Sequence, residues 1–171
     1  TDKIAGKYTA QNIVDMADAF YDDKRWLQAY ALYRTVFCAA DEQQAEIETR
    51  MAICCAELGN DSRALKHFQT AYKLDTTNVT GFQNYIYHLG IDGQYDVVIE
   101  ICNDVMKNEL LSKNAAYMAV AYAMRGCGLQ TRGFSYQALA DLTHGLELGF
   151  NDADSNIAFL MGQILLEDGQ Y

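Results

Sequence analysis

The sequence predicts an all-α protein built from repeated pairs of antiparallel helices. Apolar residues recur three and four positions apart, as on one face of a helix, and do not alternate as they would in a strand. Short stretches rich in Gly, Asn and Asp separate these helical stretches. Small apolar residues also return at a nearly constant interval, with 35 positions between Ala29 and Ala64 and 34 between Ala64 and Val98. This interval indicates that one helix pair is used several times along the chain.

The clearest pair covers residues 51–78. A turn at Gly59 to Asp61 separates two amphipathic stretches, and Gly59 is suited to the left-handed conformation that ends many helices. The expected buried positions are Met51, Ala52, Cys55 and Leu58 before the turn and Ala64, Leu65, Phe68, Ala71 and Tyr72 after it. Because one such pair cannot bury its own apolar faces, we expect neighbouring pairs to cover them.

This stretch resembles a tetratricopeptide repeat, a unit of about 34 residues that folds as helix, turn and helix. The family's pattern asks for a small and then an apolar residue on the first helix, Gly before the turn, and Ala, an aromatic residue and Ala on the second helix. Here these are Ala52, Cys55, Gly59, Ala64, Phe68 and Ala71. The resemblance implies a right-handed α-solenoid of antiparallel helix pairs, in which the first helix of each pair lines a concave face.

The same pattern can be followed over nearly the whole chain. We expect a single domain over residues 1–171, with units at about 10–43, 45–78, 79–112 and 113–149 and a half unit at 153–171. In the first unit Trp26 takes the aromatic position after the turn, whereas Lys24 stands where the family has Gly. In the third unit Ile86 replaces a small residue, and Gly81 and Gly90 should weaken the first helix.

The fourth unit is irregular. Its first helix is expected at about 113–125 and its second at about 136–148, which leaves residues 126–133 between them. This connection is about seven residues longer than in the second unit, unless the helices continue into it. The stretch Gly126-Cys127-Gly128 also gives the unit a partial resemblance to the Sel1-like repeat, whose longer turn carries Gly-x-Gly.

The chain ends after one more first helix, without the second helix of that pair. Its apolar stripe includes Ile157, Leu160 and Leu165. Terminal repeats normally carry polar caps, so an uncovered stripe predicts that the natural protein continues or that this face packs on another chain. We therefore expect the sequence to be a piece of a longer protein, and a homodimer through these three residues is one alternative.

The composition excludes some classes of function. The chain carries 13 basic and 23 acidic side chains, a net charge of −10, whereas nucleic-acid binding needs a basic surface. No apolar stretch approaches the roughly 20 residues that a membrane-spanning helix needs. We therefore expect neither nucleic acid nor a membrane span, and the charge fits partners with basic residues.

The titratable residues indicate neither catalysis nor a metal site. The five cysteines include no Cys-x-x-Cys pair, and the three histidines are scattered, so a zinc ion would lack clustered ligands. No His lies near a Cys or Ser in a pattern that helix geometry would bring together. We expect no enzyme, no cofactor and no metal. Free thiols and the absence of a signal peptide predict a cytoplasmic location.

The resemblance implies a module that binds a peptide or helix of a partner protein in its concave groove. The outward positions of the first helices are the candidate binding residues. They are Asp18, Tyr21 and Asp22 in the first unit, Arg50, Ile53 and Glu57 in the second, Asn84, Tyr87 and Ile91 in the third, and Val120 and Met124 in the fourth. Carboxylates in the first two units and apolar side chains in the last two predict a partner segment with basic residues at one end and apolar anchors at the other.

The family also includes chaperone-binding members, but the residues here do not fit that function. Chaperone-binding members of the family hold a C-terminal carboxylate with Lys, Arg and Asn at positions that correspond here to Val14, Asp18, Arg50, Thr80 and Asn84. None of the five is the residue that the family requires there, so this function is not expected. Two alternatives stay open: a self-association or scaffold segment of a larger assembly, and the regulatory arm of an enzyme whose catalytic domain lies outside this sequence.

Overall fold

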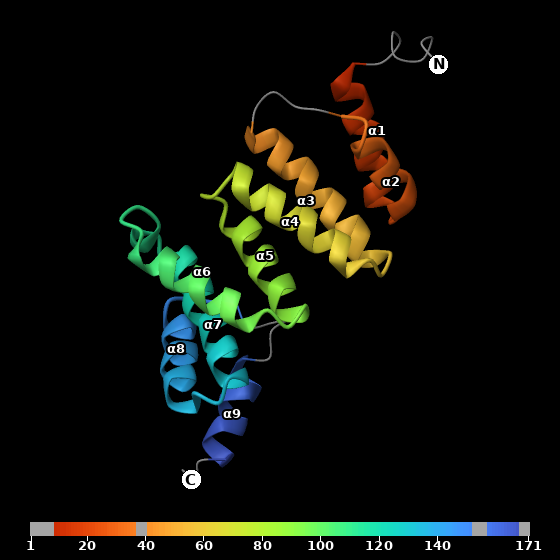
Figure 1. Ribbon diagram of the computed structural model, residues 1–171. Helices are drawn as coiled ribbons and strands as arrows, with labels where there is room; N and C mark the ends of the chain where they lie inside the picture. Colours follow the sequence, from red (N-terminus) through yellow and green to blue (C-terminus); the bar gives the residue numbers. More distant parts are fainter. Residues whose placement is uncertain (1–8, 37–40, 152–156, 168–171) are drawn as a thin grey trace. The chain divides into compact units, whose positions relative to one another are not determined.

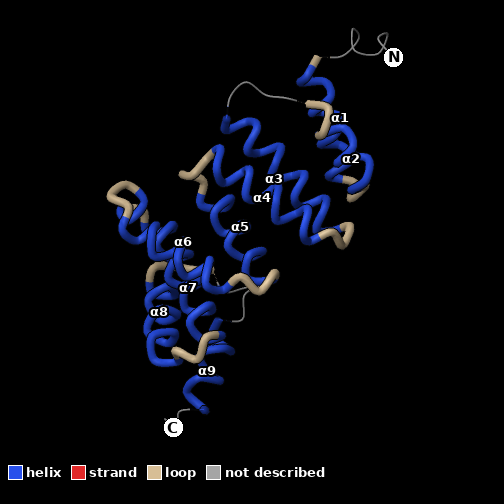
Figure 2. The backbone as a smooth tube through the Cα atoms, in the orientation of Figure 1, coloured by secondary structure: helices blue, strands red, loops and turns tan. Residues whose placement is uncertain are grey.

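The chain folds as the predicted series of helices joined by short turns (Figure 2). The computed structural model describes residues 9–36, 41–151 and 157–167, and these residues contain no strand. The elements are α1 (Ala10–Asp22), α2 (Trp26–Tyr33), α3 (Asp41–Glu57), α4 (Asp61–Leu74), α5 (Val79–Ile91), α6 (Tyr95–Lys107), the 3-10 helix η1 (Leu111–Lys113), α7 (Ala115–Thr131), α8 (Ser135–Glu147) and α9 (Ile157–Glu167). The fold is therefore an all-α helical repeat, as predicted. It divides into two compact units, residues 1–88 and 89–171.

The first unit contains two complete helix pairs. In Figure 1, α1 lies beside α2 and α3 lies beside α4, and α2 also packs on α3. Ala17, Ala29, Ala52 and Ala64 are fully buried, so their small side chains let the helix backbones approach closely. The aromatic rings of α4 stack on α5, with 4.5 Å between the ring centroids of Phe68 and His88.

The turns before the second helices share one backbone conformation. Gly59, Gly93 and Gly133 have φ angles of 74°, 78° and 83°, in the left-handed region that Gly enters without steric cost. Lys24 stands at the equivalent place in the first turn with a φ of 57°. The chain thus keeps the turn geometry where the sequence lacks Gly, at a strain of about 1 kcal/mol.

One residue of the pair at 51–78 lies outside the predicted core. Leu58 is exposed, whereas Met51, Ala52 and Cys55 are buried as expected. α3 ends at Glu57, so Leu58 belongs to the turn and no longer follows the buried face of the helix. After the turn, the second helix buries its expected Ala64, Phe68 and Ala71, and Leu65 and Tyr72 are half-buried.

The second unit is built around α7. This helix packs on α6 and on α8, and α9 packs on α8 (Figure 1). At the crossing of α7 and α8, a Cβ atom added to Gly145 would lie 2.9 Å from the backbone nitrogen of Ala123. The absence of a side chain at Gly145 is therefore what lets the two helix backbones come this close.

Of the two alternatives for residues 126–133, a long connection or helices that continue into it, the structure confirms the second. The helix continues through Gly126, Cys127 and Gly128 to Thr131, so the turn that a Sel1-like repeat would place there does not occur. A Cβ at Gly126 would lie 2.7 Å from Cγ of Leu142 on α8, and one at Gly128 would lie 3.0 Å from Cγ1 of Ile99 on α6. Close packing on both neighbours thus retains two residues of low helix propensity inside a helix.

A partly buried ion pair joins the three central helices of the second unit. Arg125 of α7 donates from Nε to Oδ2 of Asp141 at 2.6 Å and from Nη2 to Oδ1 at 2.9 Å. Its Nη1 donates to Oδ1 of Asn103 on α6 at 2.7 Å. The hydrogen bonds to Asp141 raise the pKa of Arg125, so the guanidinium stays charged.

Replacing Asp141 by Asn should destabilise the second unit by about 3 kcal/mol, because Arg125 would keep its charge without a buried counter-charge. Asp96→Asn is the matched control: it removes the exposed ion pair with Arg132 and should change the free energy of unfolding by less than about 0.5 kcal/mol. Chemical denaturation of both variants measures the difference. Equal effects would contradict a structural function for the Arg125–Asp141 pair.

Candidate functional site

A groove lies between α1 and α3, the first helices of the two pairs in the first unit. It has a volume of about 200 Å³ and is lined by Gln11, Val14, Asp18, Gln43, Glu46, Ile47 and Arg50. Ile47 is buried and Val14 is half-buried, so apolar side chains form the floor. Polar and charged side chains form the rim, as in surfaces that bind peptides.

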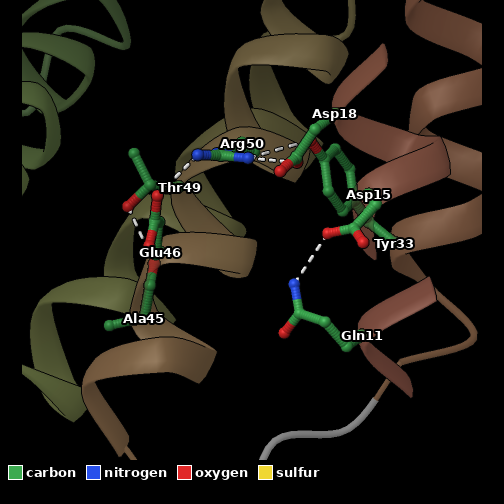
Figure 3. A network of polar contacts seen from close by, with 8 residues as sticks. All are labelled: Gln11, Asp15, Asp18, Tyr33, Ala45, Glu46, Thr49 and Arg50. Atoms are coloured by element: carbon green, nitrogen blue, oxygen red, sulfur yellow. Dashed lines mark hydrogen bonds and ion pairs between the residues drawn. The ribbon is translucent and has the colours of Figure 1, made fainter. Parts of the chain in front are cut away.

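Arg50 connects the two walls of this groove (Figure 3). Its Nη1 donates to the Oδ1 atom of Asp18 on α1, and its Nη2 donates to Oε1 of Glu46 at 2.6 Å. The hydroxyl of Tyr33, on α2, donates to the same Asp18 oxygen at 2.5 Å. Asp18 is therefore held by donors from two other helices and fixes α1 against α3.

The environment keeps the donors of this network protonated. Burial raises the pKa of Tyr33, and the hydrogen bond to Asp18 raises it further. Burial opposes the charge on Arg50, but the hydrogen bonds to Asp18 and Tyr33 outweigh it and raise the pKa of the guanidinium. The rim consequently holds an arginine and an aspartate that neutralise each other.

The other predicted residues of the first two units lie along the ends of α1 and α3. Tyr21 is half-buried, and its ring stands edge-on to Trp26, with 5.3 Å between the centroids. Ile53 is also half-buried. Asp22 and Glu57 are exposed and form no ion pair with the residues that the structure describes. These two carboxylates are thus the ones open to a basic partner.

The predicted residues on α5 are accessible. Tyr87 is 50% exposed and Ile91 is 51% exposed, one helical turn apart, and Asn84 is half-buried. Exposure of two large apolar side chains at this spacing is a feature of surfaces that contact partners.

Two residues that line the groove, Ile47 and Gln43, were not predicted from the sequence. Counting back from Arg50 by three positions leads to Ile47, and by four more to Gln43.

Val120 and Met124 do not lie on an open face, and their prediction as groove residues is wrong. Both are buried, because α7 is covered by α6 on one side and by α8 on the other. The error came from treating α7 as a helix with one exposed face. The turn before α8 is set by Gly133, five residues before Ala138, just as Gly59 precedes Ala64 by five.

The face of α9 that is exposed also differs from the predicted one. Ile157 is fully buried, so it cannot contribute to an exposed stripe, and Leu160 and Leu165 are half-buried. The exposed apolar side chains of α9 are Phe159 and Leu166, with exposed fractions of 67% and 56%. They lie seven residues apart and therefore share one face of the helix.

The described residues offer little reactive chemistry. Burial raises the pKa of Cys54 to about 11 and that of Cys102 to about 12, so both thiols are protonated and unreactive at neutral pH. Within the described ranges, no group of three His, Cys, Asp or Glu side chains could hold a metal ion. None of the helices described has the length and apolar character to cross a membrane.

Comparison with known proteins identifies similar folds. No family model and no curated protein matches the sequence. Among solved structures, the chain is similar to the TPR domain of Arabidopsis OM64, with a TM-score of 0.59 and 18% identity over 74% of this chain and 98% of that one. It is also similar to MamA of AMB-1, with a TM-score of 0.64 and 16% identity over 94% of this chain and 83% of that one.

Removing Arg50 should loosen the contact between α1 and α3. We expect Arg50→Met to lower the free energy of unfolding by about 1–2 kcal/mol, because Asp18 loses its counter-charge in a partly buried site. Glu46→Gln, which removes only the more exposed pair within α3, should cost less than about 0.5 kcal/mol. Urea denaturation of both variants and of Arg50→Met with Asp18→Asn tests this, and the double variant should recover part of the loss. No recovery would argue against direct coupling.

Proposed function

We propose that this chain, which has a tetratricopeptide-repeat fold, is a protein-interaction module that holds an extended or helical segment of a partner protein. The observation that carries the proposal is the groove between α1 and α3, with its apolar floor and polar rim. Its volume of about 200 Å³ is below the range of about 300–1,000 Å³ that is usual for pockets enclosing small molecules. A side chain of a bound peptide fits such a groove better than a small molecule does.

The charges suggest what such a segment contains. Asp18 and Glu46 are engaged by Arg50, which leaves Asp22 and Glu57 to meet basic residues of the partner. The net charge of −10 would draw such a partner towards the chain. Basic residues near Asp22 and Glu57 are therefore the first part of the proposed recognition.

The side chains of α5 supply the second part. Tyr87 and Ile91 present apolar surface that an apolar anchor of the partner would cover. The amide of Asn84 can donate to and accept from the backbone of a peptide. The segment proposed thus combines basic residues with at least one large apolar side chain.

Selection of peptides from a random display library tests the proposal. We expect the selected peptides to carry basic and apolar residues together. Tyr87→Ala and Asn84→Ala should each weaken their binding about tenfold, as removal of a central contact does. Fluorescence anisotropy with labelled peptides measures the dissociation constants.

Leu27→Ala is the matched control, because Leu27 is exposed on α2 and does not line the groove. Its peptide affinity should equal that of the unchanged chain. If Tyr87→Ala and Asn84→Ala also bind the selected peptides with unchanged affinity, the proposed surface is wrong.

Self-association is a second candidate function, favoured by the exposed face of α9. Phe159 and Leu166 would form the centre of the contact. If this face associates, light scattering should show a mass that rises with concentration from that of one chain towards two. Phe159→Glu should abolish the rise, and Leu27→Glu, on α2, should not. The mass of a single chain at every concentration would exclude this candidate.

A further inference from the structure

We propose that a second hollow of the first unit, formed by α2, α3 and α4, binds the phosphate group of a phosphorylated serine or threonine side chain. Its volume is about 470 Å³, and its lining includes the charged residues Arg34, Glu48, Arg63 and Lys66 and the imidazole of His67. We call it the basic hollow. Its lining shares no residue with the groove between α1 and α3, so the proposal does not rest on peptide binding there.

Helix geometry brings the cations of the basic hollow together. On α4, Arg63 lies three residues before Lys66 and four before His67, so Arg63 shares a face of the helix with both. Arg34 directly follows α2, and its guanidinium carbon lies 5.7 Å from the ring centroid of Tyr30. The Tyr30 hydroxyl lies 3.2 Å from Nε2 of His67, so α2 and α4 meet at this hollow.

A single carboxylate lies among these cations. Glu48 of α3 is 2.7 Å from Nδ1 of His67, which places it within hydrogen-bond distance of the ring. Apart from the imidazole, Arg34, Arg63 and Lys66 together with this carboxylate leave a charge of about +2 in the basic hollow. A phosphorylated side chain carries about −1.5 to −2 at neutral pH and matches that charge.

The basic hollow gathers three cations in an acidic chain. Arg34, Arg63 and Lys66 form no ion pair with the described residues, as is also true of Lys24 and Lys73, but these three line one hollow. Acidic side chains outnumber basic ones by 23 to 13. Gathering three unpaired cations costs repulsion that folding alone does not require, and a bound anion would offset it.

The summed charge of the donors favours a phosphate, which carries up to two negative charges, over a single carboxylate. The planar guanidinium groups of Arg34 and Arg63 can each offer two parallel N–H donors to phosphate oxygens, and Lys66 adds a third charge. A long acidic segment would also meet the acidic remainder of the surface. A single phosphate instead concentrates its charge inside the hollow.

Nuclear magnetic resonance titration tests the assignment directly. The probe is N-acetyl-phosphoserine amide, added to the ¹⁵N-labelled chain at pH 7 in buffer without phosphate. We expect saturable shifts of the backbone amides of residues 30–34 and 63–70. N-acetyl-aspartate amide, which has a single negative charge, should bind about tenfold more weakly.

Variants distinguish phosphoserine binding in the basic hollow from a general attraction of the anion to positive side chains. Arg63→Gln and Lys66→Gln should each weaken phosphoserine binding about tenfold, the loss expected for one charge-assisted hydrogen bond. Both side chains are exposed, so neither change disturbs the core. Lys24→Gln is the matched control: it removes the same charge from the turn before α2, at the opposite end of that helix from Arg34, and should leave the affinity unchanged.

Each remaining outcome overturns the assignment. Shifts that do not saturate, or that persist unchanged in Arg63→Gln and Lys66→Gln, would mean that the hollow is not a site. Equal affinity for the aspartate derivative would make it a site for acidic residues. Tighter binding of inorganic phosphate than of phosphoserine would make it a site for the free anion.

Tyr87→Ala, which disrupts the proposed peptide surface, should leave phosphoserine binding unchanged, so the two proposals can fail separately.

Discussion

Close approach of helix backbones is the constraint on which the rest of this structure depends. The first unit meets it with buried alanines, at Ala17, Ala29, Ala52 and Ala64. The second unit goes further, because a Cβ at Gly145 would meet the backbone of α7 at 2.9 Å. In each turn, a residue in the left-handed conformation lies five positions before a small or β-branched core residue of the second helix. This constant spacing sets the two helices of a pair in register.

The polar surfaces left by this packing are of two kinds. In the groove, Arg50, Asp18 and Tyr33 satisfy one another, so the network stiffens the wall between α1 and α3. In the basic hollow, Glu48 pairs with His67, whereas Arg34, Arg63 and Lys66 form no ion pair with the described residues. The groove offers an apolar floor, and two exposed carboxylates lie nearby. The basic hollow offers uncompensated charge, which is the property that attracts an anion.

The sequence was least informative where tertiary contacts outweigh local preference. Gly126 and Gly128 look like a loop because glycine weakens helices, yet both lie inside α7, where Leu142 and Ile99 occupy the space that side chains would need. The helix pattern does not show that α7 has neighbours on two sides, so Val120 and Met124 were predicted as groove residues although both are buried. The same limit applies to α9, whose apolar residues surround much of the helix and do not reveal which face is buried.

By itself the sequence determined the helix pairs, their turns and the buried small residues, because the three- and four-residue spacing and the repeat near 34 residues are local properties of the chain. It also identified Tyr87 and Ile91 as exposed positions, since their register follows from the turn at Gly93. Only the tertiary structure decided that Asp18 is neutralised by Arg50, 32 residues away, and that Arg34 meets Arg63 and Lys66 at one hollow. Periodicity orients a side chain on its own helix, but which charges become neighbours depends on how different helices pack.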